Sequence, residues 1–110
     1  MYEITRIEVR EKDVGYEMVI FFVKSGHEAE EHFKNSIYGI LQDISIDGDD
    51  FEKLHGINFG RSYISTEGEY HLPCKIKLNS LDEAGQIFEK LKNTKVFKIY
   101  KEAQEQFRKD

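Results

Sequence analysis

One short stretch constrains the fold of this chain more than any other. Residues Tyr16–Lys24 read Y-E-M-V-I-F-F-V-K, and Met18 to Val23 are six consecutive apolar residues of mostly β-branched or aromatic type. A strand with one wet face alternates, whereas a strand covered on both faces reads as a continuous apolar run. We therefore expect a strand in the middle of a sheet, with helices on one side and protein or a second subunit on the other.

The length and composition favour one domain over residues 1–110. A chain of 110 residues can bury its own core, and it contains no repeat and no linker-like segment. Its longest apolar run is far shorter than the ~20 residues of a membrane helix. The first residues are charged where a signal peptide is apolar, and a single cysteine cannot form an internal disulfide. We expect a cytoplasmic protein that does not bind membranes.

Periodicity predicts a hairpin and two helices. Tyr2–Arg10 alternates and Asp13-Val14-Gly15 is a turn signal, so residues 2–10 and 16–24 should pair. Ser25-Gly26-His27-Glu28 and Ser80-Leu81-Asp82-Glu83 both fit the capping box S-x-x-E that begins a helix. The expected buried stripes are Ala29, Phe33, Ile37, Ile40 and Leu41 in the first helix, and Leu81, Ala84, Ile87, Phe88 and Leu91 in the second.

The segment between the two predicted helices is compatible with more than one arrangement of helix, strand and loop. Gly39 either lies inside a longer first helix, which we favour, or ends it before an extra strand. Residues 40–56 can be helix, strand or loop, with one helical turn at 50–54 that Gly56 stops. Ile57–Thr66 is expected as a strand with Ile57, Phe59 and Tyr63 in phase. Glu69–Leu78 alternates cleanly, and Pro73 within it suggests an edge strand or a bulge.

The order of the predicted helices and strands resembles that of a known fold. After the second helix, residues 95–100 should form a last strand and residues 101–110 a short helix. From residue 16 onward the order βαββαβ resembles the ferredoxin-like superfold. The resemblance implies an α+β protein whose antiparallel sheet has two helices on one face, here with an extra N-terminal strand and a short C-terminal helix. That superfold hosts many unrelated activities, so it implies no specific function.

The net charge of −5 is concentrated in one segment. Residues 43–52 contain five acidic residues and no Lys or Arg; without these five, 16 acidic residues balance 16 basic ones. We call this stretch the acidic segment, and its carboxylates are Asp43, Asp47, Asp49, Asp50 and Glu52. Nucleic-acid binding needs a basic face interleaved with aromatic residues, so the acidic segment argues against it.

Motifs for catalysis or metal binding are incomplete. Asp43 to Gly48 resembles the start of a calcium loop, but the twelfth position, which needs a bidentate glutamate, is Leu54. His27 to His32 misses H-E-x-x-H because residue 31 is glutamate. Cys74 lies in phase with apolar residues and is interpreted as a buried hydrophobe. We therefore assign no catalytic residue, metal or cofactor.

Two functions from different classes fit these observations. The first is a small non-enzymatic module, of the inhibitor or immunity-protein kind, that docks a basic protein through the acidic segment. The alternative is a ferredoxin-like small-molecule-binding or sensory domain, acting as a homodimer that covers the second face of the central strand. For that alternative, the candidate ligand-pocket residues are His55, Arg61 and Tyr63.

Overall fold

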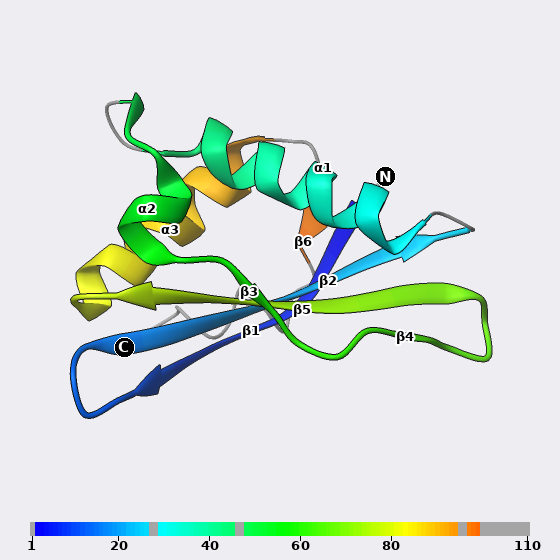
Figure 1. The fold of residues 1–110 in the computed structure, drawn as a ribbon, viewed down its shortest axis with the longest axis horizontal. Coiled ribbons are helices and arrows are strands. Elements are labelled where there is room, and N and C mark those ends of the chain that lie inside the picture. Colours follow the sequence, from blue (N-terminus) through cyan, green and yellow to red (C-terminus); the bar gives the residue numbers. More distant parts are fainter. Residues whose placement is uncertain (1, 27–28, 46–47, 95–96, 100–110) are drawn as a thin grey trace.

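A six-stranded sheet forms the body of the molecule. The computed structural model describes residues 2–26, 29–45, 48–94 and 97–99. The three long strands are β1 (Tyr2–Glu11), β2 (Tyr16–Ser25) and β5 (Glu69–Leu78), and β2 lies between the other two (Figure 1). The short strands β3 (Asn58–Phe59) and β4 (Tyr63–Ile64) both pair with β5. These five strands pair antiparallel, and β6 (Phe97–Ile99) joins β1 in parallel.

The N-terminal hairpin forms as its alternation predicts. Lys12 donates its backbone N–H to the Gly15 carbonyl at 3.0 Å, and Gly15 adopts a positive φ of 72° that suits glycine in a tight turn. The pairing register shifts between Ile4 and Arg6. This bulge lets both Ile4 and Ile7 reach the core from positions that strict alternation would place on opposite faces.

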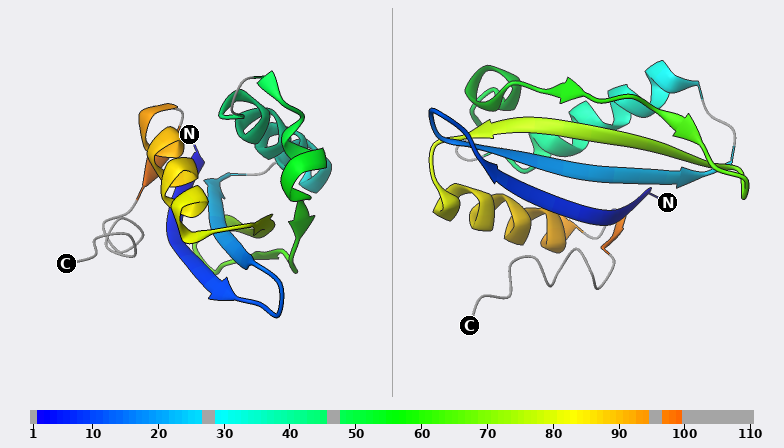
Figure 2. Two further views of the ribbon diagram at one scale, coloured as in Figure 1. Left: turned by 90° about the vertical axis from the view of Figure 1, so that its left-hand side faces the viewer. Right: turned by 90° about the horizontal axis from the view of Figure 1, so that it is seen from below.

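The central position of the apolar run is confirmed, and side chains on both faces of this strand are buried. Met18, Ile20 and Phe22 point into the core, while Val19 and Val23 on the other face are also buried. No described helix lies on that second face (Figure 2). On this face the Arg6 guanidinium lies over the Phe21 ring, 4.3 Å from its centre.

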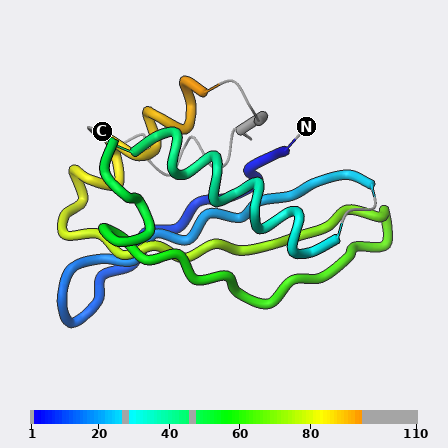
Figure 3. Tube along the Cα trace, turned by 45° about the horizontal axis from the view of Figure 1, so that its top comes forward, coloured from blue at the N-terminus to red at the C-terminus, as the bar shows by residue number. Residues whose placement is uncertain are grey.

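In the described chain, three helices pack on one face of the sheet (Figures 1 and 3). They are α1 (Glu30–Asp43), α2 (Phe51–His55) and α3 (Leu81–Thr94). The longer alternative for the first helix is confirmed, because Gly39 lies within α1. The shared core contains Ile4, Ile7, Met18, Ile20, Phe22, Phe33, Ile37, Leu41, Phe51, Leu72, Cys74, Ile76, Ala84, Ile87 and Leu91.

One of the two predicted capping boxes is wrong. β2 continues through Ser25, which pairs with Glu69, so α1 starts only at Glu30 with Ala29 as an N-cap that has no side-chain cap bond. Ala29 is consequently exposed and outside the buried stripe. The second box begins a helix as predicted, although its glutamate reaches one residue beyond Ser80. Ser80 Oγ accepts from the Glu83 amide at 3.2 Å, and the Glu83 carboxylate accepts from the Asn79 amide at 2.8 Å.

Three further sequence interpretations require correction. The expected strand over residues 57–66 is two short strands with a break between them, and Tyr63 is 57 % exposed. Leu81 is likewise 57 % exposed, because it is the first residue of α3 and lies outside the buried stripe. Pro73 is in an internal strand. Its carbonyl accepts from Gly60 at 2.9 Å, so its missing N–H faces the break between β3 and β4 and costs no bond to β2.

The extra N-terminal strand lies inside the sheet. β1 separates β2 from β6, so the strand order is β3-β5-β2-β1-β6. The described residues thus form an α+β fold with three helices over a mainly antiparallel sheet. The predicted helix over residues 101–110 lies outside the described residues. No helix in the described chain has the length and apolar character needed to cross a membrane.

Candidate functional site

The described part of the acidic segment lies between α1 and α2. Asp43 is the last residue of α1, Asp49 precedes the second helix, and Glu52 is in its first turn. All three are exposed, as is Asp50. Asp47 lies outside the described residues. The last turn of α1 contains no basic residue, so Asp43 adds a negative charge where the helix carbonyls already disfavour one.

In the part of the chain that the structure describes, these carboxylates have no basic partner. Elsewhere, Glu8 pairs with Arg6 and Arg10, and Glu17 pairs with Arg10 and Lys12. Within residues 2–26, 29–45 and 48–94, no Lys or Arg forms an ion pair with Asp43, Asp49, Asp50 or Glu52. The acidic segment is therefore a concentrated negative surface that a cation from outside would stabilise.

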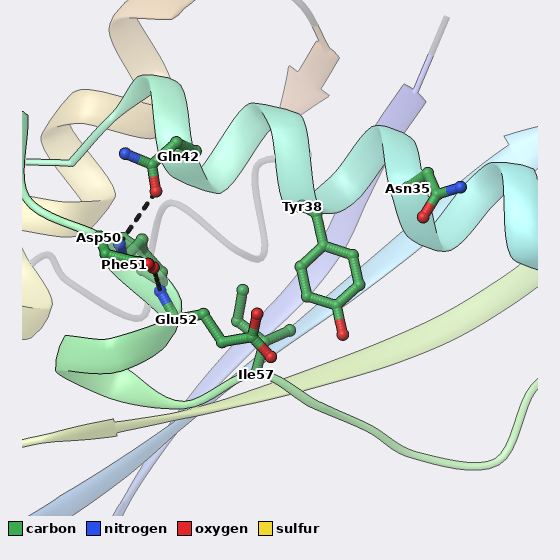
Figure 4. A pocket seen from close by; sticks show the side chains of 7 residues that line it. All are labelled: Asn35, Tyr38, Gln42, Asp50, Phe51, Glu52 and Ile57. Carbon is green, nitrogen blue, oxygen red and sulfur yellow. Dashed lines mark hydrogen bonds between the residues drawn. The ribbon is translucent and has the colours of Figure 1, made fainter.

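A cleft of about 340 Å³ adjoins these carboxylates, between α1 and α2 (Figure 4). Tyr38, Phe51 and Ile57 provide its apolar surface, and Asp50 and Glu52 border it with negative charge. Its remaining lining residues are Asn35 and Gln42. The cleft thus combines an apolar wall with carboxylates at its edge. This combination suits the aliphatic stem and charged end of a lysine or arginine side chain.

Gln42 holds the loop that shapes this cleft. Its amide nitrogen donates to the Asp49 carbonyl at 2.8 Å. Its amide oxygen accepts from the Phe51 N–H at 3.0 Å, the bond drawn from Gln42 in Figure 4. Ser45 Oγ also donates to the Asp49 carbonyl. Sequence reasoning missed Gln42, because a polar residue on the exposed side of a helix gives no sign of a partner beyond the next turn.

Asp50 also has a structural role. Its carboxylate accepts from the amides of Glu52 at 3.1 Å and Lys53 at 3.3 Å, which caps α2. At the other end, Gly56 donates to the Glu52 carbonyl at 2.8 Å and has a φ of +68°. The helical turn predicted before Gly56 is confirmed, and it fixes the direction in which Glu52 projects.

The three candidate pocket residues have different surroundings and do not line a common cleft among the described residues. His55 Nδ1 is 2.9 Å from the Lys77 carbonyl, and its ring packs against Phe51. Tyr63 stacks on His71, with ring centroids 4.5 Å apart. Arg61 is exposed in the break between β3 and β4. The cleft between α1 and α2 is lined by none of the three, and a cleft on the opposite face of the sheet, at Arg6 and Phe21, is lined by Tyr63 but not by His55 or Arg61.

A second cluster, which the sequence did not reveal, joins α1 to the β3–β4 region. The Glu30 carboxylate accepts from Ser62 Oγ at 2.6 Å and from the Tyr70 hydroxyl at 2.7 Å, and Lys34 Nζ is 3.0 Å away. These bonds, led by that from Ser62, lower the pKa of Glu30 to about 2. Hydrogen bonds across 32 and 40 residues have no local sequence signal.

We expect this cluster to make stability depend on pH in a defined window. The Glu30 pKa falls from 4.5 to about 2 on folding, so its contribution is present above pH 4.5 and is lost as pH falls toward 2. Because Glu30 is largely exposed, screening limits the contribution to about 1 kcal/mol. Urea unfolding at both ends of this window should show a smaller loss for Glu30→Gln than for wild type. Glu31→Gln, one residue along, is the control and should behave as wild type.

The structure supports the interpretation of Cys74 as a buried hydrophobe. Its side chain is fully buried, and burial raises the pKa of the thiol to about 12. A thiol of that kind is not a nucleophile at neutral pH. Among the described residues, no group of three or more His, Cys, Asp or Glu side chains is arranged to hold a metal ion.

No protein-family model matches the chain, and no curated protein or solved structure matches it either.

Proposed function

We propose that this protein is a small non-enzymatic binding module, of the inhibitor or immunity-protein kind, which docks a basic protein through the acidic segment. One observation supports this most strongly: the described carboxylates of that segment are exposed and form no ion pair with the described chain. Clustered unpaired carboxylates repel one another, so a cationic partner would relieve a cost that the free protein bears.

The adjoining cleft suggests how the partner engages. A lysine or arginine of the partner would lay its stem against Tyr38 and Ile57 and place its charge beside Glu52. The loop held by Gln42 would keep this arrangement in place before binding, which lowers the entropic cost of docking. The neighbouring carboxylates would mainly accelerate association and select against acidic proteins.

We further propose that the scaffold is one domain of ferredoxin-like ancestry with β1 inserted between the first and last strands of βαββαβ. Omitting β1 leaves the order β3-β5-β2-β6, with β6 running antiparallel to β2. That order supports the proposal, since the ferredoxin-like superfold places its first and third strands at the centre.

Affinity capture from native lysate tests the docking proposal. The test variant carries Asp49→Asn, Asp50→Asn and Glu52→Gln, and asparagine at position 50 preserves the cap on α2. The matched control carries Glu11→Gln, Asp13→Asn and Glu89→Gln, which removes the same charge from other exposed positions. We expect a basic protein to bind the wild type and the control but to be lost from the test variant. The loss should be largest at low ionic strength, where the Debye length is longest.

The proposal fails if the test variant and the control capture the same proteins in the same amounts. It also fails if both variants lose the partner equally, because net charge and not the acidic segment would then explain binding. Circular dichroism and urea unfolding of all three proteins establish that each is folded.

A further inference from the structure

The face of the sheet that carries no described helix has an ordered pattern of side chains. The strand pairings place Arg6, Phe21 and Pro73 in one row across β1, β2 and β5. The next row toward the start of β1 ends with His71 and Tyr63. Figure 2, in its right-hand view, shows this face toward the viewer with the helices behind the sheet.

A cleft of about 440 Å³ lies on this face, and it is separate from the acidic segment. Its volume falls within the ~300–1,000 Å³ of small-molecule sites. The lining side chains that matter here are Thr5, Arg6, Phe21, Tyr63, His71 and Pro73. The β-bulge at Thr5 interrupts the regular ladder at the edge of the cleft, a device that is common beside binding sites.

Planar groups and hydrogen-bond donors converge on this cleft. The Arg6 guanidinium lies 4.3 Å from the centre of the Phe21 ring, and the Tyr63 and His71 rings are nearly parallel, at 6°. Arg6 Nε lies 3.0 Å from the Glu8 carboxylate. The two terminal nitrogens of the Arg6 guanidinium have no hydrogen-bond or ion-pair partner in the described chain. The Tyr63 hydroxyl likewise has no hydrogen-bond partner among the described residues.

We propose that this cleft binds a small planar aromatic ligand that carries one carboxylate. The terminal nitrogens of Arg6 would hold the carboxylate in a bidentate pair, and the ring would lie among Phe21, Pro73 and the Tyr63–His71 stack. Glu8 and Glu69 flank the cleft through their contacts with Arg6 and His71. Their charges disfavour polyanions, so the site selects a single carboxylate over a polyphosphate.

Titrations followed by NMR test this assignment with naphthoate, naphthylmethylamine and inorganic pyrophosphate as probes. We expect naphthoate to bind and to shift the signals of Phe21, Tyr63 and His71, and the other two probes to bind at least about tenfold more weakly. Arg6→Gln and Phe21→Leu should each weaken naphthoate about tenfold. The control, Arg10→Gln, removes the same charge from the same strand and face, and it should leave binding unchanged.

Three results would overturn the proposal. Equal weakening by Arg6→Gln and Arg10→Gln would show a general charge effect. Tighter binding of the amine or of pyrophosphate would assign the cleft to another chemistry. Concentration-dependent self-association that Phe21→Leu abolishes would show that a second copy of the chain occupies the face. None of these results bears on the acidic segment, so the two proposals can fail independently.

Discussion

Replacing Phe33 by alanine is expected to lower the free energy of unfolding by about 3–5 kcal/mol. Phe33 is fully buried on α1, and its ring centre is 5.5 Å from those of Tyr2 and Tyr70. The substitution therefore removes contacts with both β1 and β5 and leaves a cavity that a packed core cannot fill. Urea unfolding measures the loss, which is a large fraction of the stability of a small domain.

Leu54→Ala is the control for this experiment. Leu54 is 56 % exposed on α2, so its loss should change stability by no more than about 0.5 kcal/mol. If Phe33→Ala cost as little as Leu54→Ala, α1 would not be packed on the sheet through Phe33 as described.

Replacing Gly15 by alanine is expected to destabilise the protein by about 3 kcal/mol, from backbone strain and a steric clash together. Its φ of +72° is costly for a residue with a Cβ, by about 1–2 kcal/mol. A Cβ at this position would also lie 2.4 Å from the carbonyl oxygen of Leu78, which is backbone and cannot move aside. The β1–β2 hairpin would have to shift away from the end of β5.

Gly68→Ala separates these two costs. Gly68 lies in the turn before β5 with a φ of +81°, but a Cβ there meets nothing within 4 Å. Its substitution should cost only the conformational part, about 1 kcal/mol. Thermal or urea unfolding of the two variants should therefore differ clearly. Equal losses would contradict the close approach of the hairpin to β5.

Local patterns in the sequence predicted most of the individual elements. The apolar run at 18–23, the stripe through Phe33 and Ile37, and the stop at Gly56 are each contained within a few residues, and each is confirmed. The helix start predicted at Ser25 was wrong, because Ser25 continues the strand and pairs with Glu69 instead of capping a helix. Tertiary context of this kind outweighs a local motif.

The arrangement of elements was less accessible from sequence. The order of elements along the chain does not reveal that β1 separates β2 from β6 in the sheet. That position depends on which strand edges pair in three dimensions. The same limit explains Tyr63, whose phase with Ile57 was broken when the chain left the sheet between β3 and β4. The continuous run in β2 was also not proof of a dimer, because Val19 and Val23 are buried within the single chain.

The acidic segment and the cleft at Arg6 differ in how far the sequence alone could predict them. The acidic segment could be identified from sequence because its five carboxylates lie within residues 43–52. The role of Gln42 in holding its loop, the Glu30 cluster and the cleft at Arg6 depend on contacts between distant segments. His55 and Arg61 were chosen for their chemistry alone, and the structure does not bring them to a shared cleft among those described.

In the proposed function, the acidic segment is the surface that meets a basic partner. Carbodiimide cross-linking of the captured complex tests it most directly, because this reagent joins a carboxylate to a lysine amine without a spacer, and so only where the two are in direct contact. Mass spectrometry should find the cross-links on Asp43, Asp49, Asp50 or Glu52. Cross-links confined to carboxylates outside residues 43–52, such as Glu11 or Glu89, would contradict the claim.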